Sequence, residues 1–317
     1  MRFARIAAAA ALAAVALPAF AADPVVPAGP LSAAVMQRLL VTDAARVGNR
    51  IIAVGDRGHI AYSEDNGATW RRAAAPAVPL LTAVRFLDEK RGWVVGHDSV
   101  ILATADGGAT WARQFSAPTE QRPLLDLLAL DAKRAFAVGA YGAFYETTDG
   151  GATWNPKKAT ADDKHLNAIL NLGKDRLLIL GEAGTVLRST DAGANWQPLA
   201  SPYKGSFFGG VVTPDGAVVA FGLRGRIYRS TDAGSSWTQV ENRSEAALMN
   251  ATLMADGTLA LSGNAGTVLV SRDNGQSFAP LPTGRRGVIA KVVGGAPDQI
   301  LLMGESGVRS LARSPPK

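Results

Sequence analysis

The chain has 317 residues, contains no cysteine and carries a formal net charge of +6. The absence of cysteine excludes disulfides, thiolate metal sites and lipid attachment through a cysteine, so stability must come from packing alone. The charge is only mildly basic, which argues against nucleic acid as a partner.

Residues 1–22 have the composition of a secretory signal peptide. Arg2 and Arg5 precede an apolar run over residues 6–17, and a small-residue cleavage site follows. The run is too short to span a bilayer, and no later stretch reaches the length of a membrane helix. We therefore expect cleavage of this segment, a mature net charge of +4, and a periplasmic or secreted location without a membrane span.

An eight-residue pattern occurs six times between residues 63 and 278. Ser or Thr stands two residues before an Asp, a Gly follows two residues after it, and an aromatic residue follows five residues after it. The aspartates recur every 41 to 43 residues, a period typical of an array of small β-units. The six pairs are Asp65 and Trp70, Asp106 and Trp111, Asp149 and Trp154, Asp191 and Trp196, Asp232 and Trp237, and Asp273 and Phe278.

We interpret this pattern as six structural turns and not as six catalytic carboxylates. The Asp accepts hydrogen bonds from nearby backbone N–H groups, the Gly supplies a positive φ, and the aromatic ring packs between neighbouring units. A calcium loop is the alternative for such a run, but its alternating oxygen ligands and its closing Glu are missing. The sequence therefore predicts no metal and no cofactor.

A second pattern, G-x-x-G between two apolar runs, precedes each of these turns and occurs once more near the C-terminus. Copies begin at Gly55, Gly139, Gly181, Gly222, Gly263 and Gly304, and the copy at residues 96–99 has lost its second Gly. Apolar runs on both sides of such a turn predict a β-hairpin. A nucleotide-binding loop would need the G-x-G-x-x-G spacing and a following helix.

The repeat predicts an all-β, seven-bladed β-propeller of four-stranded antiparallel blades over residues 31–312. Residues 79–115, for example, divide into strands at 80–86, 93–96, 100–104 and 110–114. The seventh blade lacks the aspartate turn and is one strand short. We expect residues 23–30 to supply that outer strand and close the ring, which would remove an exposed edge, and residues 313–317 to form a short tail.

Strand reversal separates two kinds of loop onto opposite faces of the predicted propeller. The aspartate turns share one face with the turns between first and second strands, and the G-x-x-G turns share the other with the blade-to-blade connections. The second face varies in sequence, as binding loops on rigid scaffolds do. It carries a predicted basic collar for an acidic protein surface, with Tyr141 as an exposed anchor; scattered, solvated charge is the simpler alternative. The basic members are Arg57, Arg122, Lys164, Lys204, Arg224, Arg226, Arg243, Arg285 and Arg286.

The six turns match the Asp-box, or bacterial neuraminidase repeat. Their spacing, the G-x-x-G hairpins and the export signal together resemble the photosystem II stability and assembly factor family, over residues 31–311. The resemblance implies a non-enzymatic periplasmic or lumenal propeller that helps to assemble a membrane protein complex through an arginine-rich patch. We expect the chain itself to be monomeric. In a non-photosynthetic host the client would be another inner-membrane complex.

The competing interpretation is a glycoside hydrolase, since sialidases and xyloglucanases also carry Asp-boxes. The F/Y-R-I-P motif that places the first sialidase arginine is absent, and xyloglucanases place their acids between two propellers, whereas this chain predicts one. His59, His97 and His165 lie on different blades without metal-ligand spacing.

Overall fold

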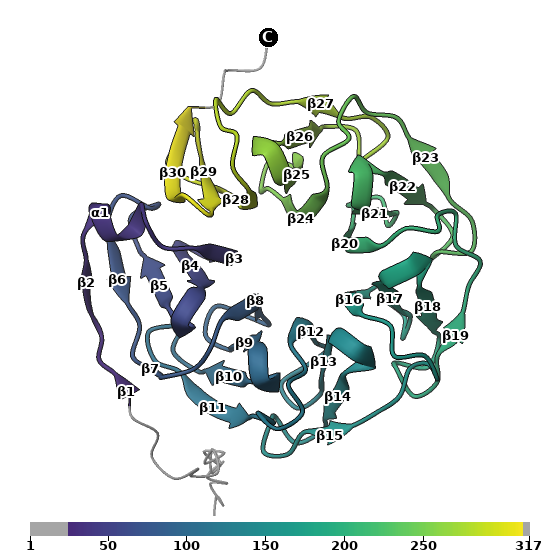
Figure 1. Ribbon diagram of the computed structural model, residues 1–317, viewed down its shortest axis with the longest axis horizontal. Helices are drawn as coiled ribbons and strands as arrows, with labels where there is room; N and C mark the ends of the chain where they lie inside the picture. The colour runs from purple at the N-terminus through teal and green to yellow at the C-terminus, as the bar shows by residue number, and fades with distance from the viewer. Residues whose placement is uncertain (1–24, 313–317) are drawn as a thin grey trace, which may run out of the picture.

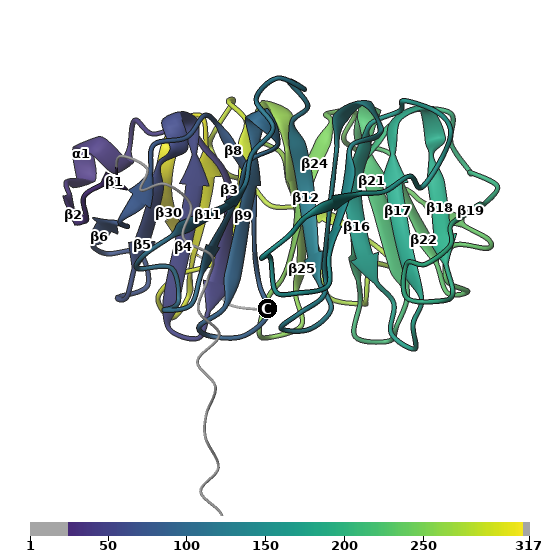
Figure 2. The same cartoon turned by 90° about the horizontal axis from the view of Figure 1, so that it is seen from below.

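The computed structural model describes residues 25–312. Seven antiparallel sheets surround a central channel, so the predicted seven-bladed propeller is confirmed (Figure 1). In Figure 2 the strands run between two faces of a flat disc. Within the described range, no helix is long and apolar enough to cross a membrane.

Each blade begins with an inner strand and proceeds outwards. Blade 1 contains β3 (Val41–Val47), β4 (Arg50–Gly55), β5 (Ile60–Ser63) and β6 (Trp70–Arg72). Blade 2 contains β8 (Leu81–Phe86), β9 (Gly92–Gly96), β10 (Ile101–Thr104) and β11 (Ala112–Phe115). Blade 3 contains β12 (Leu124–Ala129), β13 (Ala135–Gly139), β14 (Phe144–Thr147) and β15 (Asn155–Pro156). Blade 4 contains β16 (Leu166–Asn171), β17 (Leu177–Gly181), β18 (Val186–Ser189) and β19 (Gln197–Pro198).

The remaining blades follow the same order. Blade 5 contains β20 (Phe207–Val212), β21 (Val218–Gly222), β22 (Ile227–Ser230) and β23 (Thr238–Val240). Blade 6 contains β24 (Leu248–Leu253), β25 (Leu259–Gly263), β26 (Val268–Ser271) and β27 (Ala279–Pro280). Blade 7 contains β28 (Ile289–Gly294), β29 (Gln299–Gly304) and β30 (Gly307–Ala312). Short 3₁₀ turns join second and third strands in the first six blades: η1 (Asp56–Gly58), η2 (His97–Ser99), η3 (Ala140–Gly142), η4 (Glu182–Gly184), η5 (Leu223–Gly225) and η6 (Asn264–Gly266).

The second strand of each blade is largely apolar because neighbouring blades cover both of its faces. β13 and β17, for instance, are buried at every residue. Buried apolar clusters fill the seven spaces between adjacent blades. Six of them include the aromatic residue of an Asp-box, which packs against the preceding blade as predicted. The cluster between blades 6 and 7 contains no aromatic residue.

The predicted closure by an N-terminal strand in blade 7 was wrong. β1 (Val25–Val26) pairs with β7 (Ala75–Pro76), and β2 (Gly29–Leu31) pairs with β6, so the segment extends blade 1 to five strands. Blade 7 keeps three strands in the described part of the chain. The segment stays with blade 1 because Leu31 lies opposite Trp70 and packs on the core between blades 7 and 1.

The ring closes through side chains and one short helix. α1 (Ala33–Met36) follows β2, and the carbonyl oxygen of Met36 lies so close to Gly307 that a side chain there would collide with it. Met36 and Val308 are buried together in the cluster between blades 7 and 1. The predicted signal peptide (1–22) and C-terminal tail (313–317) lie outside the described residues.

Candidate protein-binding face and central channel

Each Asp-box forms a turn whose polar groups satisfy one another, as the first copy illustrates. Asp65 accepts hydrogen bonds from the Thr69 backbone N–H at 2.8 Å, the Thr69 hydroxyl at 2.5 Å and the Ser63 hydroxyl at 2.8 Å. The Ser63 hydroxyl in turn accepts from the Gly67 N–H at 2.8 Å. The carboxylate is therefore occupied within its own turn, which is the geometry expected of a structural residue.

These hydrogen bonds favour the charged carboxylate and lower its pKa. Bonds from Thr69 hold the pKa of Asp65 at about 2, and Asp149, Asp191 and Asp273 also have pKa values of about 2. The pKa values of Asp106 and Asp232 are lowered as well. We call the face that carries these turns the box face.

The opposite face, which we call the loop face, carries the 3₁₀ turns and the blade-to-blade connections. A connection covers the turn of the preceding blade: the Gly142 N–H donates to the Lys164 carbonyl at 3.0 Å, and the Ser99 N–H donates to the Arg122 carbonyl at 3.1 Å. The middle residue of each turn has a left-handed backbone, which is strained for any residue other than Gly. Arg57, Tyr141 and Arg224 occupy three of these positions, with φ of 50°, 54° and 57°.

The predicted collar residues lie on the loop face, and nearly all are exposed. The side chain of Arg57 is 87% exposed and Tyr141 is 55% exposed, whereas Lys164 is half-buried and pairs with Asp162 at 3.1 Å. The exposed basic members are Arg57, Arg122, Lys204, Arg224, Arg226, Arg243, Arg285 and Arg286. None of the collar residues lines the cavities of the central channel. Their role in binding stays a prediction.

The structure brings the collar residues together in pairs. Arg122 and Tyr141 line one groove of about 490 Å³ beside blade 3, where the Tyr141 ring stands edge-on to His165 with ring centres 4.9 Å apart. Arg285 and Arg286 line a separate hollow of about 210 Å³ at blade 7.

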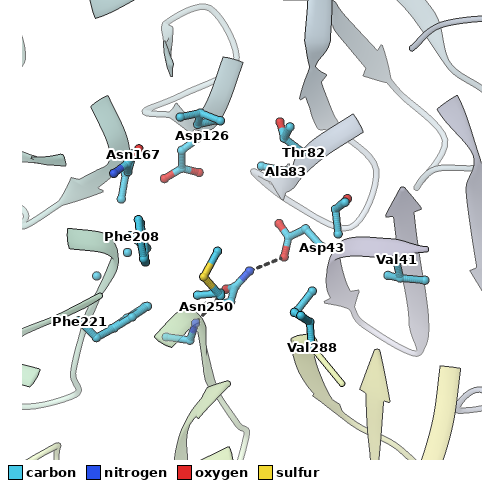
Figure 3. A pocket seen from close by; sticks show the side chains of 18 of the residues that line it. Val41, Asp43, Thr82, Ala83, Asp126, Asn167, Phe208, Phe221, Asn250 and Val288 are labelled. Atoms are coloured by element: carbon cyan, nitrogen blue, oxygen red, sulfur yellow. Dashed lines mark hydrogen bonds between the residues drawn. The ribbon is translucent and has the colours of Figure 1, made fainter. Parts of the chain in front are cut away.

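The central channel holds a charged network that the sequence analysis missed. Arg85 on β8 bridges Asp43 on β3, at 2.5 Å, and Asp126 on β12, at 2.7 Å. Lys291 on β28 lies 3.4 Å from Asp43 and donates to Asn250 on β24 at 2.8 Å. Figure 3 shows Asp43, Asp126 and Asn250 pointing into the opening from different blades, where the cavity measures about 420 Å³.

Burial and pairing act against each other in this network. Burial alone would raise the pKa of Asp43, but Lys291 and Arg85 outweigh it and lower that pKa. Burial opposes the charge on Arg85, yet Asp126 and Asp43 outweigh it and raise the guanidinium pKa. Burial raises the pKa of Asp126 and lowers that of Lys291. Opposite charges balance within the network, so it holds blades together and presents no net charge to a ligand.

The chain is similar to known proteins in both sequence pattern and fold. The model described as "Photosynthesis system II assembly factor YCF48" matches residues 112–258. A search of curated protein sequences found no significant match. The chain resembles the YCF48 family.

Solved structures of YCF48 share the fold over nearly the whole chain. "YCF48 bound to D1 peptide" matches with a TM-score of 0.68 and 20% identity, covering 96% of this chain and 100% of that one. YCF48 from Cyanidioschyzon merolae matches with a TM-score of 0.68 and 17% identity, covering 90% and 98%. The GH74 enzyme of Niastella koreensis matches with a TM-score of 0.66 and 18% identity, covering 89% of this chain but 44% of the enzyme.

The channel carboxylates of the described residues are held by hydrogen bonds and ion pairs within the protein. Two of the carboxylates that line the channel, Asp43 and Asp126, are both bound by Arg85. Asp126 also accepts from the backbone N–H of Ile169 at 3.0 Å and of Leu127 at 2.9 Å. No group of His, Asp or Glu within residues 25–312 is arranged to hold a metal ion.

Proposed function

We propose that this chain is a non-enzymatic, exported propeller that binds a protein segment of a membrane complex during assembly. The proposal is supported above all by the loop face, where Arg57, Tyr141 and Arg224 are held outwards at strained backbone positions. Strained positions that persist in a rigid scaffold are concentrated at functional sites. YCF48, which the chain resembles, has been solved with a D1 peptide bound, and D1 binding is a property of that protein.

The proposed partner has an acidic surface. Exposed arginines beside a protruding tyrosine are typical of protein interfaces, where they steer an acidic partner and anchor it. Capture of an extracytoplasmic partner also requires export, for which residues 1–22 supply the sequence signal.

Crosslinking in the native envelope tests this proposal. Arg57→Glu with Arg224→Glu should abolish capture of the partner, because it reverses two exposed charges, while the free energy of unfolding should change by less than about 0.5 kcal/mol. The matched control is Lys133→Glu with Lys174→Glu, which makes the same charge change at exposed positions on the box face. Undiminished capture by the Arg57 and Arg224 variant, or equal loss in the control, would contradict the proposal.

A glycoside hydrolase is the alternative that the GH74 likeness raises. A general acid must exchange its proton with substrate, and the hydrogen bonds of Asp43 and Asp126 leave neither free to do so. Incubation with xyloglucan and with a sialoside should release no sugar. Release that Asp126→Asn abolishes would establish the hydrolase instead.

A further inference from the structure

Among the described residues, blade 7 ends in an open strand edge. In blades 1 to 6 a fourth strand pairs with the third, but β30 pairs only with β29 within the described residues. Figure 1 shows β30 as the outermost strand of the yellow blade 7, whereas in the neighbouring blade 6 β27 lies outside β26. An unpaired edge is a template for a further strand, and proteins usually protect such edges.

The hydrogen-bonding position on this edge can be identified from the other blades. In blades 3, 4 and 6 the residue after the fourth-strand proline donates its N–H to the first residue of the third strand: Lys157 to Phe144 at 2.7 Å, Leu199 to Val186 at 2.9 Å and Leu281 to Val268 at 2.9 Å. Val308 is the equivalent acceptor in blade 7, since it pairs with the residue before the first glycine of the turn. No fourth strand is present among residues 25–312 to donate to its carbonyl.

The space beside the edge also lacks an apolar side chain. Every other space between blades contains an aromatic residue supplied at the start of a fourth strand, and the cluster between blades 6 and 7 has none. Leu311 of β30 is only partly buried against that cluster. An added strand that carries an aromatic residue at the same place would complete the seventh cluster as Trp237 completes the one between blades 4 and 5.

The charge of the residues beside the β30 edge indicates what kind of strand could pair with it. Arg285, Arg286 and Arg309 line the hollow at the loop-face end of β30, and no acidic residue lines it. These three arginines form no ion pair within the described residues, and the Nε of Arg309 is buried without a hydrogen-bond partner. A buried guanidinium nitrogen gains most from a carboxylate or amide oxygen on the neighbouring strand.

We infer that the edge of β30 binds an extended acidic segment of a partner protein, which adds as the fourth strand of blade 7. This rests on the proposed protein-binding function and names a second contact for the same kind of partner. A second copy of the chain fits poorly, because antiparallel pairing of two β30 strands would gather the same arginines on both sides. Residues 313–317 are also a poor complement, because they contain two basic residues and two prolines but no acid.

A peptide copied from the chain itself provides the probe. Residues 232–241 contain Trp237, the strand Thr238–Val240 and two acidic residues, with no basic residue. In blade 5, Val240, Gln239 and Thr238 pair with Ile227, Tyr228 and Arg229. In the same register on blade 7 they would pair with Val308, Arg309 and Ser310, and Glu241 would reach the arginine-lined hollow.

Fluorescence anisotropy of the terminally blocked, labelled peptide with the mature chain should show saturable binding. Val240→Pro in the peptide removes the N–H aimed at Val308 and should weaken binding roughly tenfold. Gln239→Pro should have a much smaller effect, because blades 3, 4 and 6 hold proline at that place. Equal loss with both prolines, or no saturable binding, would overturn the inference.

Charge exchange tests the contact with Arg309. Gln239→Glu in the peptide should tighten binding by about threefold, and Arg309→Glu in the chain should weaken it by a similar factor or more. A Gln239→Lys peptide should then bind the Arg309→Glu chain better than it binds the unmodified chain. Failure of this rescue would show that the peptide does not lie along β30.

The lack of cysteine permits a direct test of register. Residues opposite each other in a hydrogen-bonded strand pair have Cα atoms about 5.5 Å apart, which suits a disulfide. With a mild added oxidant to accept the two electrons, Ser310→Cys in the chain should therefore form a disulfide with a Thr238→Cys peptide. Val270→Cys, at the equivalent position of blade 6, should not, because β26 is already paired with β27. Crosslinking at both positions, or at neither, would refute the added strand.

The proposed function and the proposed edge site can be refuted independently of each other. The Arg57 and Arg224 variant leaves blade 7 intact, and the Arg309 and Ser310 variants leave those two arginines intact. Partner capture without peptide binding would retain the proposed function and remove the edge site. Dimers in sedimentation that Arg309→Glu disperses would assign the edge to a second copy and overturn the inference.

Discussion

The Asp-box carboxylates and the channel carboxylates are all held by hydrogen bonds or ion pairs, but their partners lie at very different distances along the chain. Asp106 is satisfied by residues no more than four positions away, such as Thr104 and Thr110. Asp43 instead depends on Arg85, 42 residues away, and Asn250, 207 residues away. The box carboxylates therefore stabilise single turns, and the channel carboxylates stabilise the relative placement of blades.

Removal of Arg85 should show the difference most strongly. Arg85→Met leaves Asp126 and Asp43 buried without their shared cation. Breaking a fully buried pair from one side costs about 3 to 5 kcal/mol, and because the Arg85 side chain is 36% exposed we expect a loss of about 2 to 3 kcal/mol. Urea unfolding monitored by tryptophan fluorescence measures this. Arg91→Met is the control, since Arg91 and Asp88 form an exposed pair on the same blade and should contribute less than about 1 kcal/mol. Equal costs would mean that the channel network does not hold the ring.

Acidification should destabilise the fold mainly by protonating the Asp-box carboxylates on the box face. The pKa values of Asp65, Asp149 and Asp273 are about 2 in the folded chain against 3.8 for an unperturbed carboxyl. A lowered folded-state pKa stabilises the fold above the unfolded value, and this contribution is lost as the pH falls from about 4 towards 2. Asp126, with its raised pKa, contributes with the opposite sign. The Tm should therefore fall between pH 4 and 2, and a Tm that rises over this interval would contradict the assignment.

Replacing the aspartate of a single Asp-box should lower the free energy of unfolding by the smallest amount. Asp106→Ala removes the acceptor for the Thr110 N–H and hydroxyl, a loss comparable to that of a helix N-cap, and should cost about 1 kcal/mol. Differential scanning calorimetry, with Asp163→Ala at an exposed loop-face position as control, measures it. A cost above that of Arg85→Met would reverse the comparison.

The same difference in distance explains what the sequence predicted. The box turns and blade number follow from contacts within one repeat, so the period and the Ser, Asp and Gly positions were sufficient. The channel network depends on residues such as Asp43, Arg85, Asp126 and Lys291, which meet only after the ring has formed. Their signal was present as charged residues within otherwise apolar inner strands about 41 residues apart.

The error in ring closure has a similar origin. The missing strand in blade 7 was evident from the absent Asp-box, but the place of residues 25–31 depends on packing of Leu31 with Trp70, which no repeat pattern specifies. The loop-face residues were placed on the correct side from strand direction alone. Their distance from the channel was not predictable, because it depends on how far each connection extends from the inner strand.

The junction of the first and last blades has a dynamic consequence. Blades 1 and 7 share no strand. They are joined by side-chain packing and by a few polar contacts, such as the hydrogen bond that the Arg46 guanidinium donates to the Gly294 carbonyl at 2.7 Å. Partial opening of a cooperative structure starts where the fewest backbone bonds must break. Amide hydrogens of β28 to β30 should therefore exchange with solvent faster than those of blades 3 to 5. This would show that the ring opens transiently between blades 7 and 1.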